Sequence, residues 1–193
     1  MDNVIARIEL PRRRFTVEEY SRMGEAGILG PAERVELIEG DIVNKPVIGP
    51  RHAAGVAELT RRFVLAAGER AVLWPQNPIT ISRDSVPEPD IALLRPRRDH
   101  YASDVVRPQD VLLVVEVADT SYRYDRDVKL RLYARAGITE TWIVDLEHDG
   151  VEVFRQPGPS DYGSIERVAR GGRVAPLAFP DIVVAVDSEL LAR

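Results

Sequence analysis

Cysteine is absent from this 193-residue sequence, and lysine is almost absent. The lack of cysteine excludes disulfides, thiolate metal ligands and cysteine nucleophiles together. Of the 26 basic residues only Lys45 and Lys129 are lysines, and all the others are arginines. An ammonium is compact and its pKa shifts readily, whereas a guanidinium stays charged. Each lysine therefore marks a position where the chain needs a cation of that particular kind.

Long apolar segments and export signals are missing as well. The longest run of large apolar residues, at 111–115, is far too short to cross a membrane. The N-terminal stretch before Phe15 contains four arginines and no apolar block, so the sequence predicts no signal peptide. We therefore expect a cytoplasmic protein that makes no contact with a membrane.

Several common catalytic motifs are also absent. There is no glycine-rich phosphate loop and no Gly-x-Ser-x-Gly elbow, so a serine nucleophile has no support. The three histidines are scattered without metal-ligand spacing, which argues against zinc. The net charge of −5 argues against tight nonspecific binding of nucleic acid. The arginine clusters at residues 61–62 and 95–98 could form a local basic surface that binds nucleic acid. The alternative is that they are ordinary solvated surface residues.

The chain has the length and apolar content of one globular domain, with 45% hydrophobic residues. We expect residues 1–14 to form an N-terminal arm and residues 15–193 a single domain. A capping box, Thr16 with Glu19, predicts a helix that ends near Ala26. Residues 34–43 predict two strands around a turn, and apolar residues at helical spacing predict a core-facing helix over residues 52–67.

In the second half of the chain the sequence pattern predicts a series of strands with one helix between them. That helix is expected from about residues 121–125 to Ala136, with Gly137 as its C-terminal cap. The order predicts an α/β (α+β) domain with a mixed central β-sheet and helices on its faces. The strands are predicted at residues 71–74, 79–82, 89–94, 111–117, 141–145 and 151–155, with short β runs over 163–186 and a last helical turn at 188–192.

Two acidic residues accompany strands that are otherwise apolar. Asp90 precedes a short apolar strand, and Glu116 lies near the end of the most apolar strand. Charged side chains are rarely placed there unless they are paired or bound to metal. Two negative charges close together repel, so either a cation lies between them or one acid keeps a proton. A hard divalent ion such as Mg²⁺ is the natural partner for such oxygen ligands.

The predicted helix after Glu116 carries a polar face. Asp125, Lys129 and Tyr133 are spaced four residues apart and therefore lie along one side of that helix. A loop and one helical turn can bring Lys129 back over the strand end that holds Glu116. This geometry predicts an ammonium close to the two acids.

Each of these residues also has a simpler interpretation when taken alone. Asp90 can cap a strand, and Glu116 can form a buried ion pair with any arginine. Lys129 and Asp125 can form a surface pair worth only ~0.3–0.5 kcal/mol. His52 can be a surface histidine at the start of a helix. The joint arrangement favours a site over these separate interpretations.

The ordered set of motifs resembles the Uma-type family, a bacterial group of restriction-endonuclease-like proteins often known only as a domain of unknown function. The family is a branch of the PD-(D/E)xK nuclease superfamily, so the resemblance implies a restriction-endonuclease-like core. The similarity runs from about residue 15 to residue 186. It is carried by residues 34–43, His52, Pro89-Asp90, Val115-Glu116-Val117, Asp125 with Lys129 and Tyr133, and residues 137–145.

The resemblance implies roles for individual residues. Asp90 and Glu116 correspond to the two acids of the superfamily motif, and with the Val117 backbone carbonyl they would hold Mg²⁺ or Mn²⁺. The superfamily usually places its lysine two residues after the second acid, where this chain has Ala118. The resemblance points instead to Lys129 on the following helix. Supporting residues are expected at Glu36, His52, Gln76, Asp125 and Tyr133.

These expectations lead to the hypothesis of a Mg²⁺-dependent endonuclease that hydrolyses DNA phosphodiester bonds. Lys129 would orient the attacking water or stabilise the charge that builds on the phosphate. The rival hypothesis is a non-catalytic module on a nuclease fold that binds protein or nucleic acid. A third is an enzyme acting on RNA or on a small-nucleotide phosphodiester. By analogy with nucleases that cut both strands, we also expect a homodimer.

Overall fold

A six-stranded mixed sheet forms the centre of the fold, with the strand order β3-β4-β5-β6-β7-β8. The central strands β5 (Val111–Ala118) and β6 (Glu140–Asp145) run parallel, and the other neighbouring pairs are antiparallel. The computed structural model describes residues 12–30 and 32–192, so most of the expected arm lies outside the described residues. The remaining strands of this sheet are β3 (Val72–Pro75), β4 (Ile91–Leu94), β7 (Gly150–Pro157) and β8 (Tyr162–Ala169).

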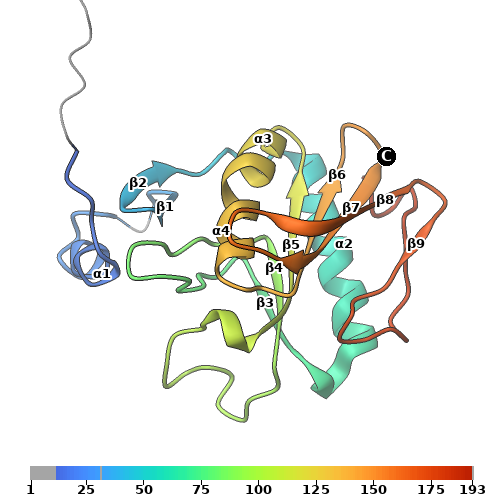
Figure 1. The fold of residues 1–193 in the computed structure, drawn as a ribbon, viewed down its shortest axis with the longest axis horizontal. Helices are drawn as coiled ribbons and strands as arrows, with labels where there is room; N and C mark the ends of the chain where they lie inside the picture. The colour runs from blue at the N-terminus through green and yellow to red at the C-terminus, as the bar shows by residue number, and fades with distance from the viewer. Residues whose placement is uncertain (1–11, 31, 193) are drawn as a thin grey trace, which may run out of the picture.

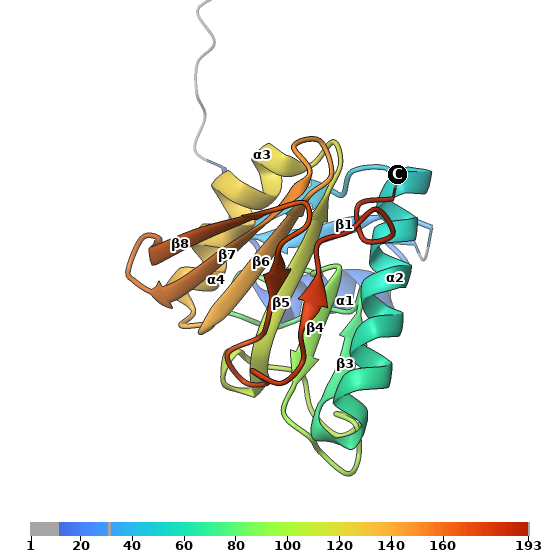
Figure 2. The same ribbon diagram turned by 90° about the vertical axis from the view of Figure 1, so that its right-hand side faces the viewer.

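Helices cover both faces of the sheet, as Figures 1 and 2 show. Helix α2 (Pro50–Ala67) lies on one face. On the other face α3 (Tyr122–Tyr124), the π-helical turn η3 (Asp125–Lys129) and α4 (Leu130–Arg135) follow one another without a break. The predicted mixed sheet with flanking helices is therefore confirmed.

The spacing of apolar residues explains how α2 meets the sheet. Its buried residues recur every three or four positions and so form a single apolar stripe. Phe63 packs on Trp142 of β6, with 6.1 Å between the ring centroids. Burial of each large apolar side chain stabilises the fold by ~1.5–3 kcal/mol. The stripe consists of Val56, Leu59, Phe63 and Ala67, and it faces Leu113, Val115, Val117, Trp142 and Val144.

Local signals in the sequence place most element ends correctly. Helix α1 (Val17–Glu25) begins at the predicted capping box, with Glu19 N–H donating to Thr16 Oγ1 over 3.3 Å. Helix α2 begins two residues before the predicted start because proline is favoured in a first helical turn. Gly137, at φ +78°, follows α4 as predicted. The predicted hairpin forms as β1 (Val35–Ile38) and β2 (Asp41–Asn44).

The strand predicted at residues 79–82 is wrong. The backbone amides in this segment donate alternately to residues 85–87 and to Val106, so no continuous ladder forms with either partner. Ile79 N–H donates to Pro87 O and Thr80 N–H to Val106 O, each over 2.9 Å, and Ile81 N–H donates to Ser85 O over 3.1 Å. Strand β3 pairs with β4 instead. The short helices η1 (Gly68–Arg70) and η2 (Pro108–Asp110) precede β3 and β5.

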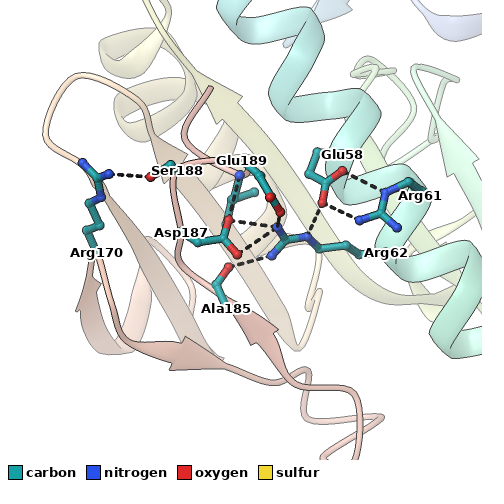
Figure 3. A network of polar contacts seen from close by, with 9 residues as sticks. Glu58, Arg61, Arg62, Arg170, Ala185, Asp187, Ser188 and Glu189 are labelled. Atoms are coloured by element: carbon teal, nitrogen blue, oxygen red, sulfur yellow. Dashed lines mark hydrogen bonds and ion pairs between the residues drawn. The ribbon is translucent and has the colours of Figure 1, made fainter. Parts of the chain in front are cut away.

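The C-terminal segment is fastened onto α2. Strands β9 (Arg173–Val174) and β10 (Val184–Ala185) pair with each other, and the predicted last helical turn is a hydrogen-bonded turn at residues 188–192. Arg62 of α2 donates to the Ala185 carbonyl over 2.8 Å and to both Asp187 oxygens over 2.9 and 3.0 Å (Figure 3). This cation therefore ties the end of the chain to the helix that leads to the pocket described next.

Candidate active site

A pocket opens where the start of β4 and the end of β5 meet the first turn of α2 and the turn η3. The two strands are antiparallel, with Ile91 opposite Val115, so the residues just before β4 lie beside the end of β5. About 490 Å³ of empty space, part of it open to solvent, lies within the pocket. The β1–β2 hairpin and the loop after it supply its outer wall, including Arg34, Glu36 and Lys45. Much of the lining is charged.

Asp90 and Glu116 hold each other in place through the backbone. Asp90 Oδ2 accepts a hydrogen bond from Val117 N–H over 2.8 Å. In return, Asp90 N–H donates to Glu116 Oε2 over 3.2 Å. The two carboxylates therefore lie side by side, and Asp90 links two strands rather than only capping one.

Glu116 is buried, with 2% of its surface exposed. Its Oε1 accepts hydrogen bonds from Tyr133 OH over 2.6 Å and lies 2.8 Å from Lys129 Nζ. The interpretation of Glu116 as the partner of an arginine is therefore wrong. The buried cation at this position is the rare lysine.

Lys129 is also buried, with 4% of its surface exposed, so the surface-pair interpretation is wrong. Its Nζ donates a second hydrogen bond to the Glu88 carbonyl over 3.1 Å. The π-helical geometry of η3 places both Asp125 and Lys129 on the pocket side. Asp125 accepts from Ser121 Oγ over 2.6 Å. Single π-helical turns inside α-helices are frequent at functional sites.

A second layer of polar contacts surrounds the two acids and the lysine. Glu36 of β1 is buried and accepts from Tyr124 OH over 2.8 Å and from Glu88 N–H over 2.9 Å. Lys45, which follows β2, forms an ion pair with the Glu88 side chain. These contacts fasten the β1–β2 hairpin over the pocket. Both lysines of the chain therefore line the same pocket.

His52 lies in the first turn of α2 and faces Asp90. Its Nε2 is 3.0 Å from Asp90 Oδ1, but the contact is poorly aligned and this buried nitrogen has no well-directed hydrogen bond. The side chain is only 13% exposed, so the interpretation as a surface histidine is wrong. Gly55 makes the approach of α2 possible, because a Cβ there would lie 3.0 Å from Val117 Cγ1.

The charges in the pocket depend strongly on burial and on one another. Burial raises the pKa of Glu116 to about 8, and Lys129 only partly opposes that shift. Burial also raises the pKa of Asp125, to about 6. For Asp90 the contact with His52 and the charge of Lys129 outweigh burial and lower the pKa. Burial therefore favours the neutral form of Glu116, whereas the contacts of Asp90 favour its ionised form.

The two cations respond to the acids around them. Burial works against the charge of Lys129, but Glu116 and its other acidic neighbours outweigh burial and raise its pKa well above the usual value. Lys129 therefore stays protonated and serves as a fixed positive charge. The contact with Asp90 raises the pKa of His52 despite burial.

Most of the predicted site residues meet in this pocket, and one does not. The exposed side chain of Gln76 is absent from the pocket lining, and only its backbone N–H takes part, donating to the Asp90 carbonyl over 3.0 Å. Ser121, Tyr124 and Glu88 line the pocket without having been predicted. The residues brought together as expected are Glu36, His52, Asp90, Glu116, Asp125, Lys129 and Tyr133, the last lying behind Glu116.

The donor atoms fit a hard divalent cation. Asp90 and Glu116 offer carboxylate oxygens to the pocket, and Mg²⁺ commonly binds one or two carboxylates with water completing its shell. The poorly satisfied His52 Nε2 is consistent with a further polar group in the pocket. No cluster of three or more His, Asp or Glu ligands occurs in residues 12–30 and 32–192. Any ion here would rely on two carboxylates and on oxygens from outside the side chains.

Two comparisons with known proteins both find similarity to proteins described as putative nucleases. Residues 17–187 match the family Uma2, described as "Putative restriction endonuclease". A solved structure from Anabaena variabilis, titled a "putative nuclease belonging to DUF820", superposes with a TM-score of 0.71 at 16% identity and covers 92% of this chain and 98% of that one. At this identity the likeness shows the fold. No curated protein matches the sequence.

Proposed function

Because the chain belongs to the Uma2 family, described as "Putative restriction endonuclease", we propose that it is a nuclease that hydrolyses DNA phosphodiester bonds with a divalent metal ion. The observation that carries this proposal is the meeting of Asp90, Glu116 and Lys129 in one pocket, with 2.8 Å between Lys129 Nζ and Glu116 Oε1. Two acids and an ammonium beside a cleft are suited to a scissile phosphate.

Each residue would contribute in a distinct way. Asp90, Glu116 and the Val117 carbonyl would hold Mg²⁺ or Mn²⁺. When bound, such an ion supplies polarisation of a phosphate oxygen and a more acidic water. Lys129, which stays protonated, would stabilise the negative charge that develops on the phosphate as the water oxygen bonds to phosphorus. Tyr133 would keep Glu116 oriented through its hydrogen bond.

Cleavage of a supercoiled plasmid tests the proposal. The purified full chain is expected to nick it with Mg²⁺ or Mn²⁺ and not with EDTA. Asp90→Asn, Glu116→Gln and Lys129→Met are each expected to lower the rate by at least about 100-fold. Arg61→Ala, an exposed change on α2, serves as a control for contaminating nucleases because it passes through the same purification. Equal cutting by all three pocket variants would reject the site.

A non-catalytic binding module is the second candidate, and the net charge of −5 favours it. The plasmid assay separates the two, because a module would bind DNA or protein in Mg²⁺ without nicking. Action on RNA instead of DNA is tested with oligonucleotides of both kinds in the same buffer.

Two further expectations concern the cellular location and the oligomeric state of the protein. Among the described residues, every helix is too short or too polar to cross a bilayer. A cytoplasmic location and a homodimer stay predictions. The molar mass in solution, measured by light scattering, tests the homodimer.

A further inference from the structure

A second pocket lies under α1, on the other side of the segment at residues 86–90. Its walls are mainly apolar and include the aromatic side chains of Tyr20 and Trp74. Tyr20 OH donates to the Val35 carbonyl over 3.1 Å, and Trp74 Nε1–H donates to the Pro78 carbonyl over 3.2 Å, so both rings are fixed. No residue of α1 is fully buried, and one side of the helix lines this pocket.

Among residues 12–30 and 32–192, the charged groups that line this second pocket are all acidic. They are Glu33, Glu88 and Asp104. Glu33 uses only Oε2, which accepts from Gly30 N–H over 2.8 Å. Asp104 uses only Oδ1, which accepts from Val105 N–H over 2.8 Å and from Arg107. Glu33 and Asp104 each have a second carboxylate oxygen that can accept a hydrogen bond. Such a lining attracts hydrogen-bond donors and repels phosphate.

Glu88 connects this pocket to the candidate active site. It lines both pockets, and its backbone carbonyl accepts from Lys129 while its side chain pairs with Lys45. A ligand that extends across Glu88 would therefore meet two lysines on one side and aromatic rings with acids on the other. A nucleotide combines groups that suit both sides. Its anionic phosphate would meet the lysines, and its flat base, which carries hydrogen-bond donors, would meet the aromatic rings and the acids.

We infer that the second pocket binds an unpaired nucleobase with an exocyclic amino group, from a nucleotide next to the scissile phosphate. This inference rests on the proposed function and deepens it by naming the substrate class. Aromatic side chains bind bases through their faces. Carboxylates accept from the amino groups of guanine, adenine and cytosine, which thymine lacks. The base would come from a single strand or be rotated out of a duplex.

Tryptophan fluorescence in EDTA tests base binding separately from catalysis. The chain has two tryptophans, and Trp142 is only 1% exposed, so a change on adding ligand reports on Trp74. Deoxyguanosine, deoxyadenosine and deoxycytidine monophosphates are expected to quench the signal saturably. They should bind at least about tenfold more tightly than thymidine monophosphate. Equal binding of all four, or no quenching by any, would overturn the inference.

Equilibrium dialysis with labelled deoxyguanosine monophosphate measures the affinity of the wild type and of matched variants. Trp74→Phe is expected to keep most of the affinity, and Trp74→Leu to lose at least about tenfold. Asp104→Asn should reduce the preference over thymidine monophosphate. If L-argininamide binds and nucleotides do not, the pocket takes a cationic side chain and the inference is wrong. Base binding without plasmid nicking would uphold a base-binding pocket while rejecting the proposed function, so the two failures are distinguishable.

Discussion

Lys129 Nζ lies 2.8 Å from Glu116 Oε1, although the two residues come from different elements and are thirteen positions apart. The position two residues after Glu116, where the motif that this chain resembles would place a lysine, is the fully buried Ala118. The helix that follows β5 brings the ammonium back to the carboxylate. The same pair of charges is thus formed from a different position in the sequence.

The two lysines of the pocket are expected to differ in their kinetic roles. Lys129→Met should lower kcat by about 100-fold or more with little change in KM, because the fixed charge acts on the transition state. Lys45→Met should mainly raise KM, because Lys45 lies at the outer wall and pairs with Glu88. Steady-state cleavage of a labelled oligonucleotide measures both. The reverse pattern would place the chemistry nearer Lys45.

Much of this arrangement was predictable from local patterns. The scarcity of lysine singled out Lys129, and the spacing of Asp125, Lys129 and Tyr133 placed them on one helix face. The apolar context of Glu116 indicated a buried charge that needs a partner. The sequence left open whether that partner is a cation or a proton. In the structure the Lys129 ammonium lies beside Glu116, and burial still raises the pKa of Glu116 to about 8.

Other features depend on contacts that no local pattern contains. Glu36 receives hydrogen bonds from Tyr124 and from Glu88 N–H, which lie far from it in the sequence. The sequence of η3 is also compatible with an ordinary helix, so its π-helical geometry could not be predicted from the residues. The apolar alternation at residues 79–82 suggested a strand, but the amides of that segment donate alternately to residues 85–87 and to Val106.

Stability in EDTA should fall as pH rises from about 5 to 8. Glu116 has a raised pKa in the folded protein, so its contribution is complete below the unfolded value of 4.5 and is lost as pH rises through about 8. The melting temperature of Glu116→Gln should depend less on pH over this range. Mn²⁺ should stabilise the wild type most above pH 8, because binding displaces the proton. Parallel pH profiles of wild type and variant would contradict this account.

His52 is expected to act as a positioning residue for Asp90. His52→Gln should weaken Mn²⁺ binding by about 10–100-fold, as losses around metal ligands typically do. Isothermal titration calorimetry measures the affinity directly. His148→Gln is the matched control, because His148 pairs with Asp145 away from the pocket lining and is 59% exposed. An equal effect of both changes would remove His52 from the site.

Arg62 holds the C-terminal segment against α2, whereas its neighbour Arg61 does not, so substitutions of the two arginines should affect stability differently. Arg62 is 15% exposed and donates to Glu58, Asp187 and a backbone carbonyl, so Arg62→Ala should lower the free energy of unfolding by about 1.5–3 kcal/mol. Arg61 is 57% exposed and pairs only with Glu58, so Arg61→Ala should change it by less than about 1 kcal/mol. Urea unfolding measures both. Equal effects would show that the tail is held by apolar packing alone.

The most direct test of the central claim is a crystal structure of the protein soaked with Mn²⁺, with anomalous scattering used to locate the ion. We expect one strong peak within about 2–2.5 Å of carboxylate oxygens from both Asp90 and Glu116. The peak should be absent in Asp90→Asn crystals soaked in the same way. A wild-type pocket without density, or an ion bound only elsewhere, would contradict the account.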